Sequence, residues 1–177
     1  MKGRGPKEPE PFVKESLPYM AQGKVLDIAC GEGRHALYLA QASPSFNVLG
    51  IDRSPTAVKV AASRAAQLGV RAHFRVRDLE KDFLPEEIFN TIVVTRYWQA
   101  NLCPHIVNHL ALGGILVYET YTLDYLRYGE RTRSHLLKSG QLKETFAQLG
   151  LRIDYYAELD RPETREYSAR LRAVKIL

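Results

Sequence analysis

The chain has 177 residues, of which 45% are hydrophobic and 25% charged, and its formal net charge is +5. This length suits one domain with a substantial core, and the composition is that of an ordinary globular protein. No apolar stretch is long enough to span a bilayer, and the N-terminus lacks the apolar core of a secretory signal. Two cysteines, Cys30 and Cys103, cannot form a disulfide framework, so we expect reduced thiols in a cytoplasmic protein that contacts no membrane.

Hydrophobic periodicity predicts strands that alternate with helices. Residues 1–10 are rich in glycine, proline and charge and are expected to form a flexible tail. The strongest helix is bounded by Ser54 as N-cap, Pro55 at its first position and Gly69 just past its end. The predicted strands are 24–29, 47–52, 71–76, 89–95 and 115–121, and the other predicted helices are 12–20, 33–41, 104–112 and 139–149.

Two more strand candidates, 151–158 and 166–176, close the chain. Residues 159–165 leave no room for a crossover helix between them, so the two strands must pair as an antiparallel hairpin. We therefore predict an α/β fold with five β-α alternations. Its doubly wound, mostly parallel seven-stranded sheet ends in a C-terminal antiparallel β-hairpin. Ligands of such sheets bind beyond the carboxyl ends of the strands.

The most informative segment is a glycine turn, residues 25–34, with the sequence VLDIACGEGR. An apolar run ends in Gly31 and Gly33, which tolerate turn conformations and leave room for a ligand, and the helix that follows offers free N–H groups. A second apolar run ends in Asp52, where a carboxylate can accept hydrogen bonds from a ribose diol. These features predict a nucleoside-type cofactor.

Residues 31–36 formally fit the dinucleotide-binding pattern, but three features disfavour NAD. The chain ends before a separate substrate domain could follow, and the terminal hairpin replaces a sixth parallel strand. Asp27 lies within the first strand, where its carboxylate would repel a pyrophosphate. The same carboxylate would attract the ammonium and sulfonium groups of S-adenosylmethionine.

Over roughly residues 11–177 the chain resembles a class I S-adenosylmethionine-dependent methyltransferase. Residues 25–33 resemble the family's first motif, an acid followed by a glycine-rich turn, and residues 89–95 resemble its fourth-strand motif. Residues 30–34 and 118–120 are similar to a bacterial group related to tellurite-resistance methyltransferases. Two positions depart from the usual Asp-x-Gly-x-Gly-x-Gly pattern, because Ala29 and His35 replace its first and last glycines.

The resemblance implies a Rossmann-like methyltransferase fold, a single domain over residues 11–177 and S-adenosylmethionine as cofactor. It implies that Asp52 holds the ribose hydroxyls and that Asp78 contacts the adenine amino group. Each has an alternative, since Asp52 could cap a helix and Asp78 could be a solvated loop residue. We predict no metal site. The predicted cofactor-binding residues are Asp27, Ala29, Cys30, Gly31, Gly33, Asp52, Arg53, Asp78, Leu79 and Thr95.

Methyl transfer from a sulfonium is an in-line displacement, so the protein mainly supplies alignment and desolvation. The acceptor pocket is expected after the fourth and fifth strands, with Glu119 and Tyr97 as catalytic candidates. The alternative for Glu119 is a strand-end carboxylate paired with an arginine, and the alternative for Tyr97 is core packing. Further pocket candidates are Arg96, Trp98, His105, Tyr121, Tyr125 and Arg127.

A small-molecule acceptor, organic or a chalcogen oxyanion, is the first hypothesis. Residues 95–98 do not resemble the Asn-Pro-Pro-Tyr segment of enzymes that methylate base amines. The net charge favours the second hypothesis, an RNA or protein methyltransferase, but the basic residues are spread along the chain, so a nucleic-acid partner is not favoured. The third is a non-catalytic cofactor-binding relative. The sequence leaves the oligomeric state open.

Overall fold

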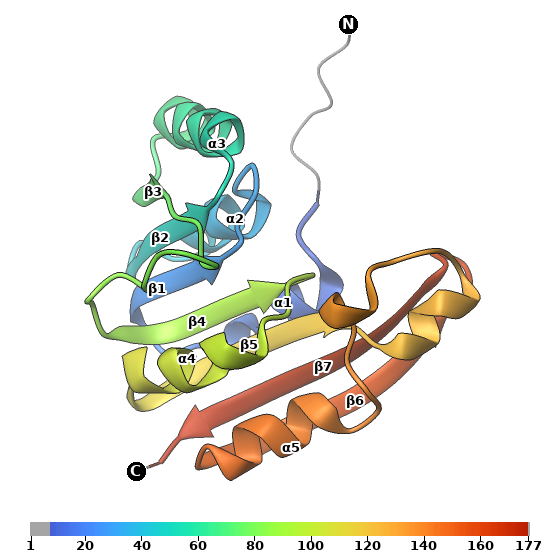
Figure 1. Ribbon diagram of the computed structural model, residues 1–177. Helices are drawn as coiled ribbons and strands as arrows, with labels where there is room; N and C mark the ends of the chain where they lie inside the picture. Colours follow the sequence, from blue (N-terminus) through green and yellow to red (C-terminus); the bar gives the residue numbers. More distant parts are fainter. Residues whose placement is uncertain (1–7, 177) are drawn as a thin grey trace, which may run out of the picture.

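The computed structural model describes residues 8–176, so most of the predicted tail, residues 1–7, lies outside the described residues. Seven strands form one sheet in the order β3-β2-β1-β4-β5-β7-β6 (Figure 1). The first five pair in parallel, and β7 runs antiparallel to both of its neighbours. This confirms the predicted fold class. The strands are β1 (Gly23–Ile28), β2 (Phe46–Asp52), β3 (Ala72–Val76), β4 (Phe89–Thr95), β5 (Leu110–Tyr121), β6 (Leu151–Arg161) and β7 (Glu166–Lys175).

Helices cover both faces of the sheet (Figure 1). One face packs against α1 (Pro11–Ser16), α2 (Arg34–Ala42) and α3 (Pro55–Leu68). The other packs against α4 (Cys103–His109) and α5 (Gln141–Gln148). Because both faces are covered, the central strands are apolar on both sides. Single 3₁₀ turns are η1 (Leu17–Tyr19), η2 (Ala100–Leu102), η3 (Leu123–Arg127) and η4 (Arg133–His135).

The predicted five β-α alternations are wrong at one point, because residues 77–88 connect β3 to β4 without a helix. This connection still covers the sheet, since Leu79 and Leu84 are buried in the same core cluster as α4. Pro85 follows Leu84 directly and disfavours a helical backbone there. A loop therefore covers the sheet at the one alternation for which no helix range was predicted.

The helix predicted over 104–112 ends earlier, at His109, and Leu110 already begins β5. Leu110 pairs with Phe89 of β4, and the register then shifts before Thr91. Gly113 and Gly114, which directly follow the predicted helix, lie inside this irregularity, where Gly113 has a φ of 74°. A bulge in a strand uses glycine for the same reason as a helix end, which explains the error.

The cap residues of α3 are confirmed. Ser54 Oγ accepts a hydrogen bond from the Ala57 N–H at 3.2 Å, and Gly69 is left-handed with a φ of 64°.

The predicted boundary between the flexible tail and the domain needs a correction. Glu10, expected in the flexible tail, is only 6% exposed and makes ion pairs with the body of the protein. We therefore propose that the single domain begins at Glu10 or earlier.

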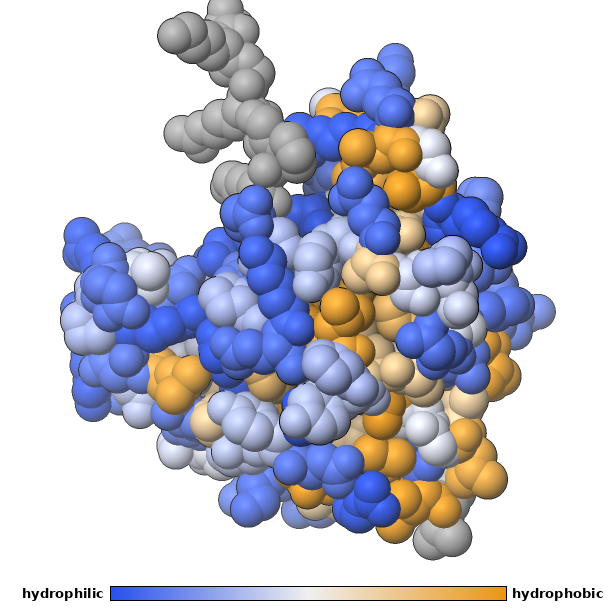
Figure 2. Space-filling view, turned by 180° about the vertical axis from the view of Figure 1, so that it is seen from behind, coloured by the Kyte–Doolittle hydropathy of each residue, from blue (hydrophilic) through white to orange (hydrophobic). Residues whose placement is uncertain are grey.

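Seen from behind, the surface is hydrophilic over the end that β6 and β7 form and more hydrophobic over the opposite half (Figure 2). The exposed large hydrophobic side chains include Phe83 and Leu112, which are 83% and 73% exposed. Within residues 8–176, no helix combines the length and the apolar character that crossing a membrane would require.

Candidate functional site

A cleft of about 240 Å³ opens at the carboxyl ends of β1, β2 and β3. It lies where the strand order reverses direction around β1, which is the usual ligand position in a doubly wound sheet. Five of the predicted cofactor residues line it, and so does Tyr97. The lining residues are Ala29, Ile51, Asp52, Arg53, Arg77, Asp78, Leu79, Glu80, Tyr97 and His135.

The Asp52 carboxylate is fixed at the end of β2 by two backbone groups. The Gly31 N–H donates to Oδ2 at 2.8 Å, and the Ser54 N–H donates to Oδ1 at 2.9 Å. Each carboxylate oxygen can accept a further hydrogen bond, so a diol can still bind. At Gly31 the φ is +55°, and no atom lies within 4 Å of the position that a Cβ would take. A ligand can therefore approach this backbone closely.

Of the other residues of the turn, Ala29 also lines the cleft, whereas Cys30 and Gly33 are buried. Ala29 has a φ of 56°, an uncommon conformation for a residue other than glycine. A Cβ on Gly33 would come within 2.9 Å of Ala61, so this glycine lets the start of α2 lie close to α3. Cys30 is buried, and burial raises the pKa of its thiol, so the thiol is unreactive. Contacts of Cys30 and Gly33 with a cofactor stay predictions.

Asp27 is fully buried within β1 and only partly satisfied. Its Oδ2 accepts a hydrogen bond from the Ala36 N–H at 3.1 Å, while Oδ1 has no hydrogen-bond partner. Desolvation by burial raises the pKa of this carboxyl from 3.8 to about 7, against the opposing effect of the Ala36 hydrogen bond and of Arg34. A buried acceptor without a partner suits an ammonium group. With the open space at Gly31, it shows that the residues present fit S-adenosylmethionine.

The far wall of the cleft is formed by Asp78, Leu79 and Tyr97. Asp78 accepts a hydrogen bond from the Glu80 N–H at 3.2 Å and pairs with Lys81, and these contacts lower the pKa of its carboxyl. The Tyr97 hydroxyl donates to Gln99, whose side-chain amide donates to the Leu79 carbonyl at 3.0 Å. Burial raises the pKa of Tyr97, so its phenol keeps its proton at neutral pH.

Thr95 lies outside this cleft, buried against His35. The Glu10 N–H donates to His35 Nε2 at 3.2 Å, so Nε2 must be an acceptor. Nδ1 then carries the ring proton and donates to Thr95 Oγ1 at 3.3 Å. Burial lowers the pKa of His35 to about 3, in keeping with a neutral ring. The histidine at the last glycine position of the motif thus ties the start of α2 to the end of β4.

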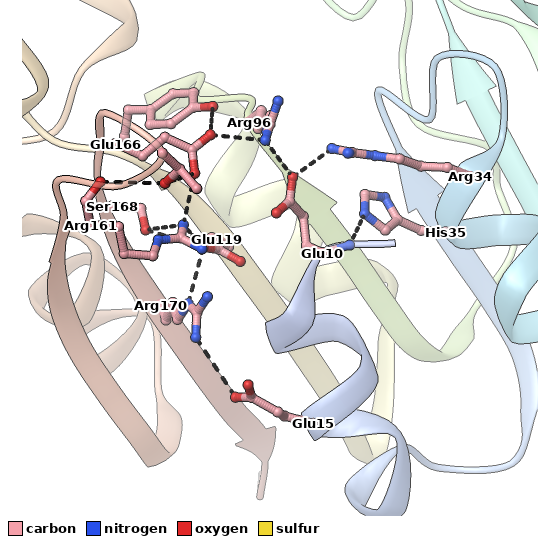
Figure 3. A network of polar contacts seen from close by, with 12 residues as sticks. Glu10, Glu15, Arg34, His35, Arg96, Glu119, Arg161, Glu166, Ser168 and Arg170 are labelled. Atoms are coloured by element: carbon pink, nitrogen blue, oxygen red, sulfur yellow. Dashed lines mark hydrogen bonds and ion pairs between the residues drawn. The ribbon is translucent and has the colours of Figure 1, made fainter. Parts of the chain in front are cut away.

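Glu119 lies in a buried ion network on β5, and the cleft does not include it (Figure 3). Its Oε1 accepts hydrogen bonds from Arg161 at 2.8 Å, Arg170 at 3.0 Å and Ser168 at 3.1 Å. The observed contacts are those of the alternative, a strand-end carboxylate paired with arginines. The structure does not bring Glu119 together with Tyr97, and a catalytic role for either stays a prediction.

The sequence reasoning missed the rest of this network. Glu166 pairs with Arg96 at 2.9 Å and with Arg161 at 3.3 Å, and Glu10 extends the chain of charges to Arg96 and Arg34. Polar residues at 166, 168 and 170 alternate along β7, and this period could have indicated a polar face. Glu10 gave no such signal, because its partners are distant in sequence.

The remaining pocket candidates divide into buried and surface residues. Trp98 packs in the core, and His105 is exposed on α4. The Tyr121 hydroxyl donates to Glu166 at 3.1 Å, and its ring lies 4.7 Å from that of Tyr125. The Arg131 guanidinium lies over both rings, at 4.2 and 5.2 Å from their centres. Arg127 is exposed and pairs with Asp124.

The family model of the methyltransferase domain matches residues 25–114, about half of the chain. The chain belongs to the S-adenosylmethionine-dependent methyltransferases. This confirms the resemblance predicted from the glycine turn, the enzyme class and S-adenosylmethionine as the cofactor. The matched residues run from the start of the glycine turn to Gly114 in β5.

Curated relatives of this methyltransferase include a release factor glutamine methyltransferase from Koribacter versatilis, 37% identical over 81 residues, which are 46% of this chain and 29% of the relative. Another is the 2-heptyl-1-hydroxyquinolin-4(1H)-one methyltransferase of Mycobacteroides abscessus, 36% identical over 91 residues, 49% of this chain and 38% of the relative. The chain therefore spans well under half the length of these two relatives.

Among solved structures, TehB from Haemophilus influenzae superimposes with a TM-score of 0.78. The match covers 94% of this chain and 62% of TehB at 18% identity, so it establishes the fold.

Proposed function

We propose that this methyltransferase binds S-adenosylmethionine across the cleft at the carboxyl ends of β1, β2 and β3 and methylates a small-molecule acceptor. The observation that carries the proposal is the Asp52 carboxylate, held by the Gly31 and Ser54 N–H groups beside open space at the glycine turn. Asp52 would accept the ribose hydroxyls, and Asp78 would lie beside the adenine. The Asp27 carboxylate would receive the ammonium group.

When bound, the cofactor supplies an electrophilic methyl group on a sulfonium. The residues of the chain orient it and exclude water. Neither catalytic candidate is placed to take a proton in the cleft, since Tyr97 is protonated at neutral pH and Glu119 lies outside the cleft. An acceptor atom that is nucleophilic without losing a proton suits this site best.

A small organic acceptor is supported by aromatic side chains in the region after β4 and β5, where we expect the acceptor pocket. These side chains are Tyr97, Tyr121 and Tyr125. The quinolone substrate in the name of one relative belongs to the same chemical class.

The proposal includes a cytoplasmic location. It is supported by two buried free thiols, Cys30 and Cys103, because thiols stay reduced in that compartment.

A macromolecular acceptor is the second candidate. Arg127, Arg131 and Arg133 follow one another closely in the sequence of the connection between β5 and α5, and the other relative is named for a protein substrate. Labelled methyl donor offered to pools of metabolites, RNA and protein separates the two. Incorporation only into RNA or protein would exclude the small-molecule acceptor.

The cofactor site is tested by Asp52→Ala. We expect the affinity for S-adenosylhomocysteine to fall by about tenfold or more, because hydrogen bonds to a charged acceptor disappear. Isothermal titration calorimetry measures this. Asp154→Ala, which removes an exposed carboxylate on β6, is the matched control and should bind normally. Unchanged affinity of a folded Asp52→Ala variant would remove the ribose assignment.

A further inference from the structure

Glu10 joins the segment before α1 to two other parts of the site region (Figure 3). Its Oε1 lies 2.7 Å from an Arg34 nitrogen and 2.8 Å from an Arg96 nitrogen, and its side chain is only 7% exposed. Its N–H donates to His35, and its carbonyl accepts from the N–H groups of Val13 and Lys14. One residue therefore starts α1 and ties it to α2 and to the end of β4.

The two arginines reach the same Glu10 oxygen from α2 and from the residue after β4. Arg34 is the last residue of the glycine turn and the first residue of α2, and Arg96 follows β4 just before Tyr97 of the cleft wall. Asp27, with its unpartnered oxygen, lies on β1 between α2 and β4, and Arg34 is close enough to lower the pKa of its carboxyl. Glu10 thus contacts α2 and the end of β4, the two elements beside Asp27. Asp52 and Asp78 line the cleft, which Glu10 does not.

Arg96 has a backbone conformation that needs such support. Its φ of 56° is unfavourable for a long side chain. Its guanidinium is held from two sides, by Glu10 at 2.8 Å and by Glu166 at 2.9 Å. Loss of the Glu10 side-chain contact would leave the strained residue held from the β7 side alone, and the segment before α1 would keep only its backbone hydrogen bonds.

We propose that Glu10 is a positioning residue that clamps the N-terminal segment over the methionine end of the cofactor site and thereby slows cofactor release. The inference rests on the proposed placement of the cofactor, with its ammonium at Asp27. A buried carboxylate shared by two guanidinium groups holds better than an exposed pair. The exposed pair of the same segment, Glu8 with Lys14, offers the comparison, since the Glu8 side chain is 85% exposed.

The test compares the dissociation rate of labelled S-adenosylhomocysteine from the wild-type protein, Glu10→Gln and the matched control Glu8→Gln. We expect dissociation from Glu10→Gln to be about fivefold faster or more, because both charge-assisted contacts weaken. Glu8→Gln should stay near the wild-type rate. A folded Glu10→Gln variant that releases the ligand at the wild-type rate overturns the clamp, even if its melting temperature falls.

Hydrogen exchange provides a readout that a merely structural role would not change. The amides of Val13 and Lys14 bond to the Glu10 carbonyl, so ligand bound beneath the clamp should slow their exchange in the wild type. Exchange that does not respond to the ligand contradicts the proposal.

A second variant tests the clamp if Glu10→Gln does not fold. Arg96→Gln removes one of the two arginine partners of Glu10 and should also speed the release of the ligand. Wild-type protein that binds no S-adenosylhomocysteine would overturn the proposed function itself, a result distinct from failure of the clamp.

Discussion

Asp27 is the residue whose chemistry depends most on its surroundings. In the unfolded chain its carboxyl would ionise near 3.8, whereas burial raises the pKa in the folded protein to about 7. Between these values the folded state keeps a proton that the unfolded state has lost, so the free energy of unfolding falls as pH rises. His35 acts in the opposite direction. Its pKa falls from 6.5 to about 3, so acid favours the unfolded state.

The Asp27 shift predicts the behaviour of Asp27→Asn without cofactor, because the His35 contribution is the same in both proteins. The variant has no carboxylate to desolvate, so its stability relative to the wild type should rise by roughly 4 kcal/mol between pH 4 and pH 8. Urea unfolding across this range measures the difference. The same variant should bind S-adenosylmethionine more weakly, because the ammonium loses its anionic partner. A stability difference that does not change with pH would contradict the assigned burial.

At the scale of elements, short sequence signals placed α3 well and the connections poorly. The N-cap, proline and glycine of α3 act through contacts within a few residues, so the sequence contains the whole cause. The loop at 77–88 and the early start of β5 depend on Leu84 and Leu110 meeting the sheet, which no local pattern records.

Ser54→Ala tests the local cap. Loss of the hydrogen bond from the Ala57 N–H should lower the free energy of unfolding by about 1 kcal/mol. Ser63→Ala, at an exposed interior position of the same helix, should be neutral or slightly stabilising, since alanine has the higher helix propensity. Thermal unfolding of both variants gives the comparison. Equal losses would show that the hydroxyl at 54 does not act as a cap.

At the scale of the whole molecule, the ion network attaches the terminal hairpin and the N-terminal segment to the sheet. Glu119 on β5 holds Arg170 on β7 and Arg161 at the end of β6, and Arg170 also reaches Glu15 of α1 at 3.7 Å. Replacing one partner of a buried pair leaves the other charge uncompensated, which costs more than the pair contributes.

Glu119→Gln should therefore destabilise the protein by about 3 kcal/mol. The matched change Glu15→Gln removes a 60% exposed partner of the same arginine and should cost less than about 0.5 kcal/mol. Denaturant unfolding measures both. A Glu119→Gln variant of normal stability that has lost methyl transfer would instead support the catalytic role predicted from the sequence.

The sequence by itself determined the sheet, the glycine turn and the acid at the end of β2, because each follows from periodicity or from the local geometry of glycine and caps. Only the tertiary structure decided the roles of Glu119, Glu10 and His35. Their partners are distant in the chain, from 24 residues between Glu10 and Arg34 to 86 residues between Glu10 and Arg96. A carboxylate becomes a ligand contact or a structural ion pair according to which distant arginine reaches it.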